Sequence, residues 1–168
     1  CVGNIVEDIN YLKNWVMPLK QNLFNLNLRL LYHPTAGTCY IKFESKAIVN
    51  FYTKVINLKE GRKENIQIPK IILDAPLEIQ LACLRGIADT DFSLSFKKDW
   101  KGVNRDPYIT LGCASRPLVL QISKILKEAD ITATIRLDVK EYDKRTNKFY
   151  IKQYLYIHGK KNLTKWMT

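Results

Sequence analysis

Residues 81–96 read LACLRGIADTDFSLSF, and the rest of the chain is interpreted outward from this stretch. Apolar residues recur in its first part at helical spacing, which predicts a helix over residues 76–90. Asp89 and Asp91 fall at the end of that helix. The alternating residues 93–98 that follow predict a strand. The stretch is therefore expected to bring two carboxylates to the start of a sheet.

Two small residues stand one turn apart on one side of the predicted helix, Ala82 and Gly86. Glycine in a helix interior costs about 1 kcal/mol relative to alanine, so its presence needs a reason. Close packing of a second helix against that side would supply one. We therefore expect Ala82 and Gly86 to form a helix interface.

The same stretch resembles the signature helix of the LAGLIDADG homing endonucleases. Residues 84–91, LRGIADTD, follow the common form LRGLFDTD of that signature. The segments NIQIP at 65–69, SLSF at 93–96 and HGKKNLTKW at 158–166 are also typical of the archaeal and intein-borne branch. The resemblance thus extends over nearly the whole chain.

The resemblance implies an α+β fold built from repeats of the order αββαββα, with an antiparallel, saddle-shaped sheet in each repeat. Residues 76–168 are expected to form one complete repeat that opens on the signature helix. Residues 1–75 are expected to form a truncated first repeat of the order α-β-β-α without a signature helix. The start of the chain, residues 1–4, is expected to be the end of a first-repeat strand. That would mean a truncated or processed polypeptide, or a natural remnant.

Periodicity and turn residues predict the individual elements. They are helix 4–24, strands 27–33 and 39–44, helix 45–57, signature helix 76–90, strands 93–98 and 107–114, helix 116–129, strands 131–140 and 149–157, and helix 161–167.

The composition indicates a globular protein. A hydrophobic fraction of 46% suffices for a core, no apolar run reaches the length of a membrane span, and the N-terminal segment lacks the pattern of a signal peptide. We therefore expect a cytoplasmic protein with no membrane partner. The four cysteines, Cys1, Cys39, Cys83 and Cys113, are far apart, which argues against a structural zinc site and favours free thiols over disulfides.

The charge is strongly positive and unevenly placed. The chain has 27 basic and 16 acidic residues, a net charge of +11, and 16 of the basic but only 7 of the acidic residues lie in 93–168. Composition alone would equally fit a lysine-rich surface without a charged partner. The asymmetry, together with the strand pattern below, favours nucleic acid.

The predicted strands 131–140 and 149–157 have one apolar face and one face with basic, hydroxyl and aromatic side chains. A solvated strand face is the alternative, but such side chains are suited to phosphates and base edges in the major groove of double-stranded DNA. The basic loops beside these strands would add phosphate contacts. The predicted DNA-binding residues are Lys97, Lys98, Lys101, Arg105, Arg136, Lys140, Lys144, Arg145, Lys148, Tyr150, Lys152 and Tyr154.

By resemblance, the second acid of the signature is catalytic and binds Mg²⁺ or another divalent metal, and the first supports the helix end. These roles fall to Asp91 and Asp89. Cleavage of a phosphodiester needs such a carboxylate-held metal to activate water and stabilise the leaving oxygen. Without the surrounding match, both acids would be read as ordinary helix-end residues.

Two departures from the family pattern bear on activity. Phe92 replaces the final glycine of the signature and is expected to crowd the site or displace Asp91. The basic residue that many members place after the second strand falls near residues 113–115, where Arg116 is the nearest cation. One signature helix also supplies only half of the paired-acid site, so a homodimer or a missing N-terminal segment is expected to contribute the other half.

The expected function is therefore that of a Mg²⁺-dependent, homing-type DNA endonuclease associated with an intron or intein. An inactive DNA-binding remnant or regulator of the same fold is the alternative. A small α+β scaffold protein whose charge has no nucleic-acid partner is a third interpretation.

Overall fold

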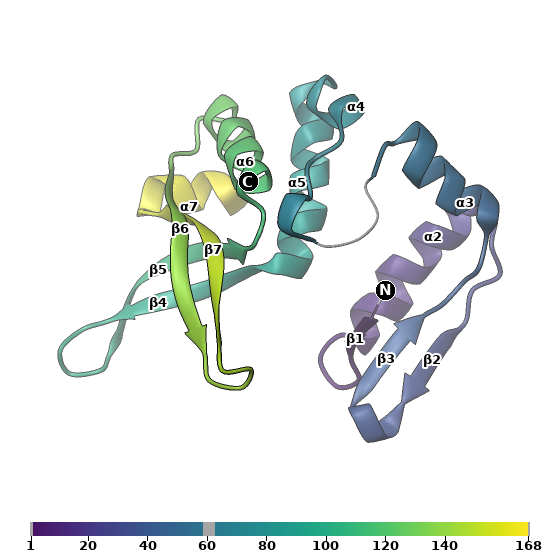
Figure 1. Ribbon diagram of the computed structural model, residues 1–168, viewed down its shortest axis with the longest axis horizontal. Coiled ribbons are helices and arrows are strands. Elements are labelled where there is room, and N and C mark those ends of the chain that lie inside the picture. The colour runs from purple at the N-terminus through teal and green to yellow at the C-terminus, as the bar shows by residue number, and fades with distance from the viewer. Residues whose placement is uncertain (1, 59–62, 168) are drawn as a thin grey trace. The chain divides into compact units, whose positions relative to one another are not determined.

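The computed structural model describes residues 2–58 and 63–167, and the chain divides into two compact units, residues 1–55 and 56–168 (Figure 1). Each unit is described by itself. Cys1 lies outside the described residues, whereas Cys39, Cys83 and Cys113 are free thiols. Among the described residues, no helix combines the length and the apolar character needed to span a membrane.

Unit 1 is a three-stranded antiparallel sheet with helical segments. Its elements are β1 (Val2–Asn4), α1 (Ile9–Tyr11), the π-helical η1 (Leu12–Val16), α2 (Met17–Phe24), β2 (Leu30–His33), the 3-10 turn η2 (Pro34–Ala36), β3 (Thr38–Ile41), α3 (Lys46–Asn50) and the π-helical η3 (Phe51–Val55). The strand order is β1-β3-β2. Leu12, Leu28, Cys39 and Ile41 form its small core.

Unit 2 has the element order α-β-β-α-β-β-α from α5 onward, as the sequence predicts. Its elements are η4 (Lys63–Asn65), α4 (Lys70–Leu73), α5 (Leu77–Asp91), β4 (Phe92–Lys98), β5 (Asn104–Cys113), α6 (Arg116–Glu128), β6 (Ala133–Asp143), β7 (Lys148–His158) and α7 (Lys160–Met167). The signature helix is shifted by one residue from the prediction, because Pro76 is its N-cap and Asp91 its last residue. The four strands form an antiparallel sheet of order β4-β5-β7-β6.

The two sheets share a topology. In unit 1 the order β1-β3-β2, with helical residues between β1 and β2, matches the order β5-β7-β6 of unit 2, with α6 between β5 and β6. The short strand β1 is thus the counterpart of β5, and Val2–Asn4 is a strand, as expected. Within its described residues, unit 1 has no counterpart of α5 or β4.

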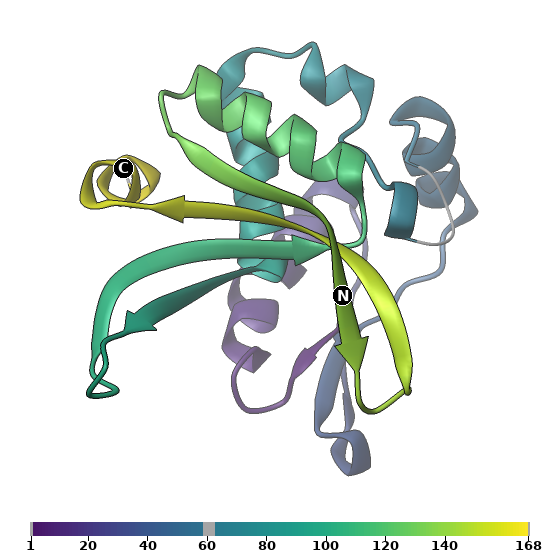
Figure 2. The same ribbon diagram turned by 60° about the vertical axis from the view of Figure 1, so that its left-hand side comes forward.

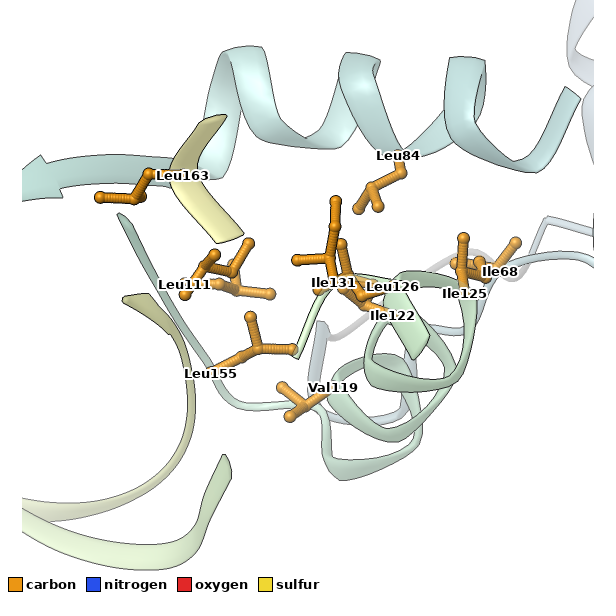
Figure 3. Close-up of a cluster of buried hydrophobic side chains, with 11 residues drawn as sticks. Ile68, Leu84, Leu111, Val119, Ile122, Ile125, Leu126, Ile131, Leu155 and Leu163 are labelled. Atoms are coloured by element: carbon orange, nitrogen blue, oxygen red, sulfur yellow. The ribbon is translucent and has the colours of Figure 1, made fainter. Parts of the chain in front are cut away.

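The helices α5, α6 and α7 lie on one side of the unit 2 sheet, and both hairpins project away from them (Figures 1 and 2). A single hydrophobic core fills the space between these helices and the sheet (Figure 3). Leu84 enters it from α5, Ile122 from α6, and Leu111 and Leu155 from the strands. Ile68, which precedes α4, is also buried in this core, so residues before 76 pack with unit 2. The other face of the sheet is not covered by any helix of the described residues of unit 2 (Figures 1 and 2).

Ser115 fixes the start of α6, and its loss should be measurable. The buried hydroxyl accepts a hydrogen bond from the Leu118 N–H (3.3 Å) and donates one to the Ile66 carbonyl (2.6 Å). Ser115→Ala removes a helix cap and leaves a carbonyl unpaired, so we expect a loss of about 2 kcal/mol in urea unfolding. Ser45→Ala is the control, because Ser45 caps α3 through Ile48 N–H alone (3.3 Å) and should cost only about 1 kcal/mol. Equal losses in the two variants would show that the bond to Ile66 adds nothing.

Candidate DNA interface and metal-binding carboxylate

The uncovered face of the unit 2 sheet follows a regular alternation up to Arg136. Ile135 lies opposite Leu155 on the face that the helices cover, and Arg136 lies opposite Tyr154 on the uncovered face. Directly opposite residues of an antiparallel pair point to the same side of the sheet. Arg136 and Tyr154 therefore share the uncovered face, as predicted.

A β-bulge changes this alternation farther along the hairpin. The register shifts by one residue between Arg136 and Val139, so that Lys140 lies opposite Ile151 and Glu141 opposite Tyr150. The prediction that Lys140 shares the face of Arg136 is therefore wrong. Its Nζ lies 4.5 Å from the centre of the Phe149 ring, on the opposite side of the hairpin. The prediction continued the two-residue alternation through the bulge. The inserted residue reverses the face of every side chain that follows it.

The bulge is held by a polar cluster around Asp138. The backbone of Asp138 has φ of 56°, a left-handed conformation that aspartate tolerates better than most residues. Its N–H donates to Gln153 Oε1 (2.8 Å), Gln153 Nε2 donates to Asp138 Oδ1 (3.2 Å), and Arg116 Nη1 binds Asp138 Oδ2 (2.7 Å). Gln153 is buried at an apolar position of the strand, and its hydrogen bonds to Asp138 explain why a polar residue occurs there. Arg116 is thus bound to the bulge. It is the cation nearest to residues 113–115, where a basic residue was expected.

Aromatic rings gather on the uncovered face. The ring centre of Tyr156 lies 6.2 Å from that of Tyr108 and 5.9 Å from that of Tyr154. Gly112 makes room for this row, since a Cβ there would lie only 2.8 Å from Cε1 of Tyr154. The register also places hydroxyl and imidazole side chains on this face, namely Ser93, Ser95, Thr110, Thr134 and His158.

Glu141 joins two of the predicted DNA-binding residues. It accepts a hydrogen bond from the Tyr154 hydroxyl, and its Oε2 lies 2.9 Å from Lys152 Nζ. These two contacts hold the pKa of Glu141 below its ordinary value. Burial, followed by the bond to Glu141, raises the pKa of Tyr154 to about 12. Sequence reasoning missed Glu141 because its face is decided by the bulge. Tyr150, by contrast, bonds through its hydroxyl to Thr146 (3.1 Å) at the turn.

The predicted basic residues outside the central face lie on the two hairpins. Lys97, Lys98, Lys101 and Arg105 belong to the β4–β5 hairpin, and Lys144, Arg145 and Lys148 to the β6–β7 hairpin. Arg105 pairs with Asp99 (3.1 Å) and Arg145 with Asp143 (3.3 Å). No acid within residues 2–58 and 63–167 forms an ion pair with the lysines of this set. The hairpins therefore present unneutralised positive charge.

The two acids of the signature helix face different surroundings. Asp91 is the last residue of α5 and exposed, and its Oδ2 accepts a hydrogen bond from Thr90 Oγ1 (3.1 Å). Asp89 instead lines a hollow of about 880 Å³ bordered by α5, β4 and α7, together with Arg85 and Lys165. This divergence follows from the helical geometry, because residues two apart do not share a face.

The surroundings of Asp91 offer few further metal ligands. Among the described residues, no group of three or more histidine, cysteine or acidic side chains is gathered closely enough to hold a metal ion. Burial chiefly raises the pKa of the Cys113 thiol, a hydrogen bond with the Ser115 backbone lowers it, and the charge of Asp91 raises it again. The charge of Asp91 thus reaches Cys113 at the end of β5, within residues 113–115 where a basic residue was expected.

Phe92 packs its ring against the core of unit 2, whereas the expectation that it crowds the site or displaces Asp91 stays a prediction. Its backbone is ordinary extended strand, with φ of −91° and ψ of 154°. It lies opposite the buried Leu111, and its ring stacks on Trp166 with centres 5.4 Å apart and planes 10° apart. The side chain enters the core because the first residue of β4 points toward the helices.

The small residues of α5 lie on an open side of unit 2. Ala82 and Gly86 are exposed, and a Cβ added at Gly86 would meet no atom within 4 Å. Within the part of unit 2 that the structure describes, no helix therefore packs against Gly86. The expectation that a second helix packs against Ala82 and Gly86 stays a prediction.

Comparison with known proteins agrees with this geometry. The model of the LAGLIDADG-like domain matches residues 78–167. No curated protein sequence matches the chain. Among solved structures, mesophilic variants of the homing endonuclease I-DmoI are similar with a TM-score of 0.62 at 15% identity, over 98% of this chain and 70% of that one.

Two further I-DmoI structures match in the same way. The complex of I-DmoI with DNA and calcium has a TM-score of 0.62 at 15% identity, over 98% of this chain and 70% of that one. A point variant bound to its target DNA in the presence of magnesium has a TM-score of 0.61 at 14% identity, with coverages of 99% and 75%. At these identities the likeness shows the fold, and it confirms the expected mixed α/β class with antiparallel sheets. The matched residues make up more than half of this chain, and the chain therefore belongs to the LAGLIDADG family.

Proposed function

We propose that this protein is a homing-type DNA endonuclease domain that binds double-stranded DNA on the uncovered face of the unit 2 sheet. The observation that carries the proposal is the composition of that face. Tyrosine rings, hydroxyl groups and Arg136 cover its centre. The two hairpins, which project away from the helices (Figure 1), carry lysines that form no ion pair with an acid among the described residues.

This distribution suits a duplex. The major groove is about 12 Å wide and admits a two-stranded β-ribbon, where hydroxyl groups and arginine can read base edges. Lysines at the hairpins would contact phosphates, which position the protein and make binding strongly dependent on salt. Lys140 lies on the opposite side of its hairpin, so it is assigned to phosphates rather than to bases.

The structural relatives support the same class of ligand. Two of the similar I-DmoI structures are complexes with DNA, one containing calcium and the other determined in the presence of magnesium. The common fold makes an equivalent use of the sheet reasonable for this chain.

For cleavage, we assign the metal ligand to Asp91 and the support of the helix end to Asp89. Magnesium keeps several waters and is commonly held by one or two carboxylates together with substrate phosphates, so a single exposed carboxylate fits part of such a site. When bound, the metal would supply an activated water and stabilise the leaving oxygen. Asp91 would orient it, and the second carboxylate would come from another signature helix packed against Ala82 and Gly86, supplied by a second copy or by a further segment.

An inactive DNA-binding relative is the second candidate. It is favoured by the end of β5, where residues 113–115 contain no basic residue and the nearest cation, Arg116, pairs with Asp138. This ion pair would compete with any use of Arg116 to polarise water or phosphate.

The two candidates are separated by measuring binding and cleavage in parallel. The full chain is titrated into a labelled duplex at several salt concentrations, and a plasmid library is incubated with the chain and Mg²⁺. Salt-dependent binding with cutting at a defined sequence supports the endonuclease. Binding without cutting selects the inactive relative, and absence of binding at low salt contradicts both.

Neutralising Glu141 is expected to strengthen DNA binding. Glu141→Gln releases Lys152 from its ion pair, and one additional phosphate contact should steepen the slope of log K against log salt by about 0.9. Fluorescence anisotropy over a salt series measures this slope. Glu128→Gln removes the same charge from α6, where Glu128 pairs weakly with Lys124 (3.9 Å), and should leave the slope unchanged. If the Glu141→Gln variant has the same salt slope as the wild type, Lys152 does not contact a phosphate.

A further inference from the structure

We propose that Trp100, at the tip of the β4–β5 hairpin, stacks on a nucleobase of the bound duplex and opens the base step that it contacts. The inference rests on the proposed DNA binding and adds a stacking residue beyond the sheet face. Its basis is a hydrogen-bonded turn that carries an exposed indole among lysines.

The tip is ordered by Asp99. Its Oδ1 accepts hydrogen bonds from the N–H groups of Lys101 (2.9 Å) and Val103 (3.0 Å), and its Oδ2 binds Arg105 Nε (3.1 Å). The Asp99 N–H also bonds to the Val103 carbonyl (2.9 Å), which closes the turn. The hydrogen bonds to the Asp99 carboxylate, above all the one from the Val103 N–H, hold the pKa of Asp99 below its ordinary value. The turn is therefore fixed before any partner binds.

Trp100 takes no part in folding this hairpin. Its side chain is 89% exposed, the highest fraction among the large apolar residues that the structure describes. The ring contacts Lys101, whose Nζ lies 4.7 Å from the ring centre. Trp166, by contrast, is packed against the core of unit 2. An indole that buries so little surface contributes almost nothing to stability, and its exposure leaves it available to a ligand.

The chemistry around Trp100 favours nucleic acid. Lys97, Lys98 and Lys101 lie within three residues of it, and none of them pairs with an acid among the described residues. Aromatic rings stack on bases while neighbouring cations bind the adjacent phosphates. Proteins that bend DNA insert apolar side chains between base steps in the same way. A membrane surface also attracts tryptophan and lysine, but interfacial segments present a broad apolar helix face that a single indole on a hairpin does not provide.

The test compares Trp100→Ala, Trp100→Phe and Trp15→Ala in the full chain. Stacking predicts that Trp100→Ala weakens duplex binding about tenfold at every salt concentration, with the salt slope unchanged because no charge is lost. Trp100→Phe should restore most of the affinity. Trp15 is an exposed tryptophan of unit 1, so Trp15→Ala controls for loss of an indole and should bind as the wild type does.

A second readout places the contact on the DNA. Duplexes with 2-aminopurine at successive positions should show a fluorescence change at one step with the wild type, and none at that step with Trp100→Ala. Wild-type affinity in Trp100→Ala would overturn the stacking role while leaving the DNA-binding proposal intact. Failure of the wild type to bind any duplex would instead contradict the proposed function itself. Binding of the wild type, but not of Trp100→Ala, to phosphatidylserine-containing vesicles, without any 2-aminopurine response, would assign the residue to a membrane.

Discussion

Replacing Phe92 with glycine is expected to destabilise the protein by about 3 to 4 kcal/mol without any gain of DNA cleavage. The ring stacks on Trp166 and packs beside the core opposite Leu111. Removing a packed phenylalanine costs about 3 to 5 kcal/mol, a partly buried one somewhat less, and glycine in a strand adds about 0.5 to 1 kcal/mol. The measurement is urea unfolding followed by circular dichroism.

The control for this prediction is Phe96→Gly. Phe96 lies on the same strand and the same face, opposite Pro107, but is 44% exposed and lies outside the core. Its replacement carries the same backbone cost and a smaller loss of packing, so about 1 to 2 kcal/mol is expected. Undiminished stability of Phe92→Gly together with increased cleavage would restore the view that Phe92 obstructs the site.

The size of the expected loss matters for interpreting any activity assay of this variant. Domains of this size are stable by about 5 to 15 kcal/mol, so the substitution would consume a large part of that margin. A loss of cleavage in Phe92→Gly would then report unfolding. The final residue of the signature is thus a packing position in this chain.

The elements of unit 2 were predictable because their patterns are local. Helical spacing located α5 to within one residue at each end, and Ser115 marked the start of α6 through its capping side chain. Alternation located the hairpin strands and identified Leu155 and Ile157 as core residues. Each of these signals lies within a few residues of the structure it predicts.

The features that were mispredicted depend on contacts across the sheet. The extra residue near Asp138 cannot be located from the alternation of β6 alone. The register of β6 depends on pairing with β7 and on the contacts of Asp138 with Gln153 and Arg116. The faces of Lys140 and Glu141 follow from that bulge. The direction of the Phe92 ring was not predictable for a related reason. A family pattern predicts which residue type is unusual, but the direction of the side chain depends on how the strand leaves the helix.

The candidate site is accordingly divided into a part that unit 2 provides and a part that it does not. The sheet face, the hairpins and Asp91 belong to one unit and need no partner to be positioned. In the proposed site, the second carboxylate and the covering of Gly86 would come from another helix. Under that proposal, DNA binding is expected from one chain, whereas cleavage would depend on what packs against α5.

Asp91→Asn is expected to abolish metal-dependent cleavage while preserving DNA binding. Loss of a carboxylate ligand removes several kcal/mol of transition-state stabilisation by the metal, or a rate decrease of about 10³-fold or more. The substitution is nearly isosteric, and the carboxylate is exposed at the helix end, so folding should be unaffected. Cleavage is measured on the plasmid substrate with Mg²⁺, and the affinity for the duplex is measured in parallel with Ca²⁺. Calorimetric titration of Mn²⁺ into the DNA complex should also show weaker binding of the metal.

Asp74→Asn is the matched control for Asp91→Asn, since it removes one exposed carboxylate from the same unit. Asp74 pairs with Lys70 on α4 (2.7 Å) and lies outside the sheet. It should leave both cleavage and the calorimetric signal unchanged. Cleavage by Asp91→Asn at the wild-type rate would mean that the metal is held elsewhere. If instead both variants and the wild type bind DNA with equal affinity and none of them cuts, with no Mn²⁺ bound, then α5 serves the chain as a packing helix and the protein acts by binding alone.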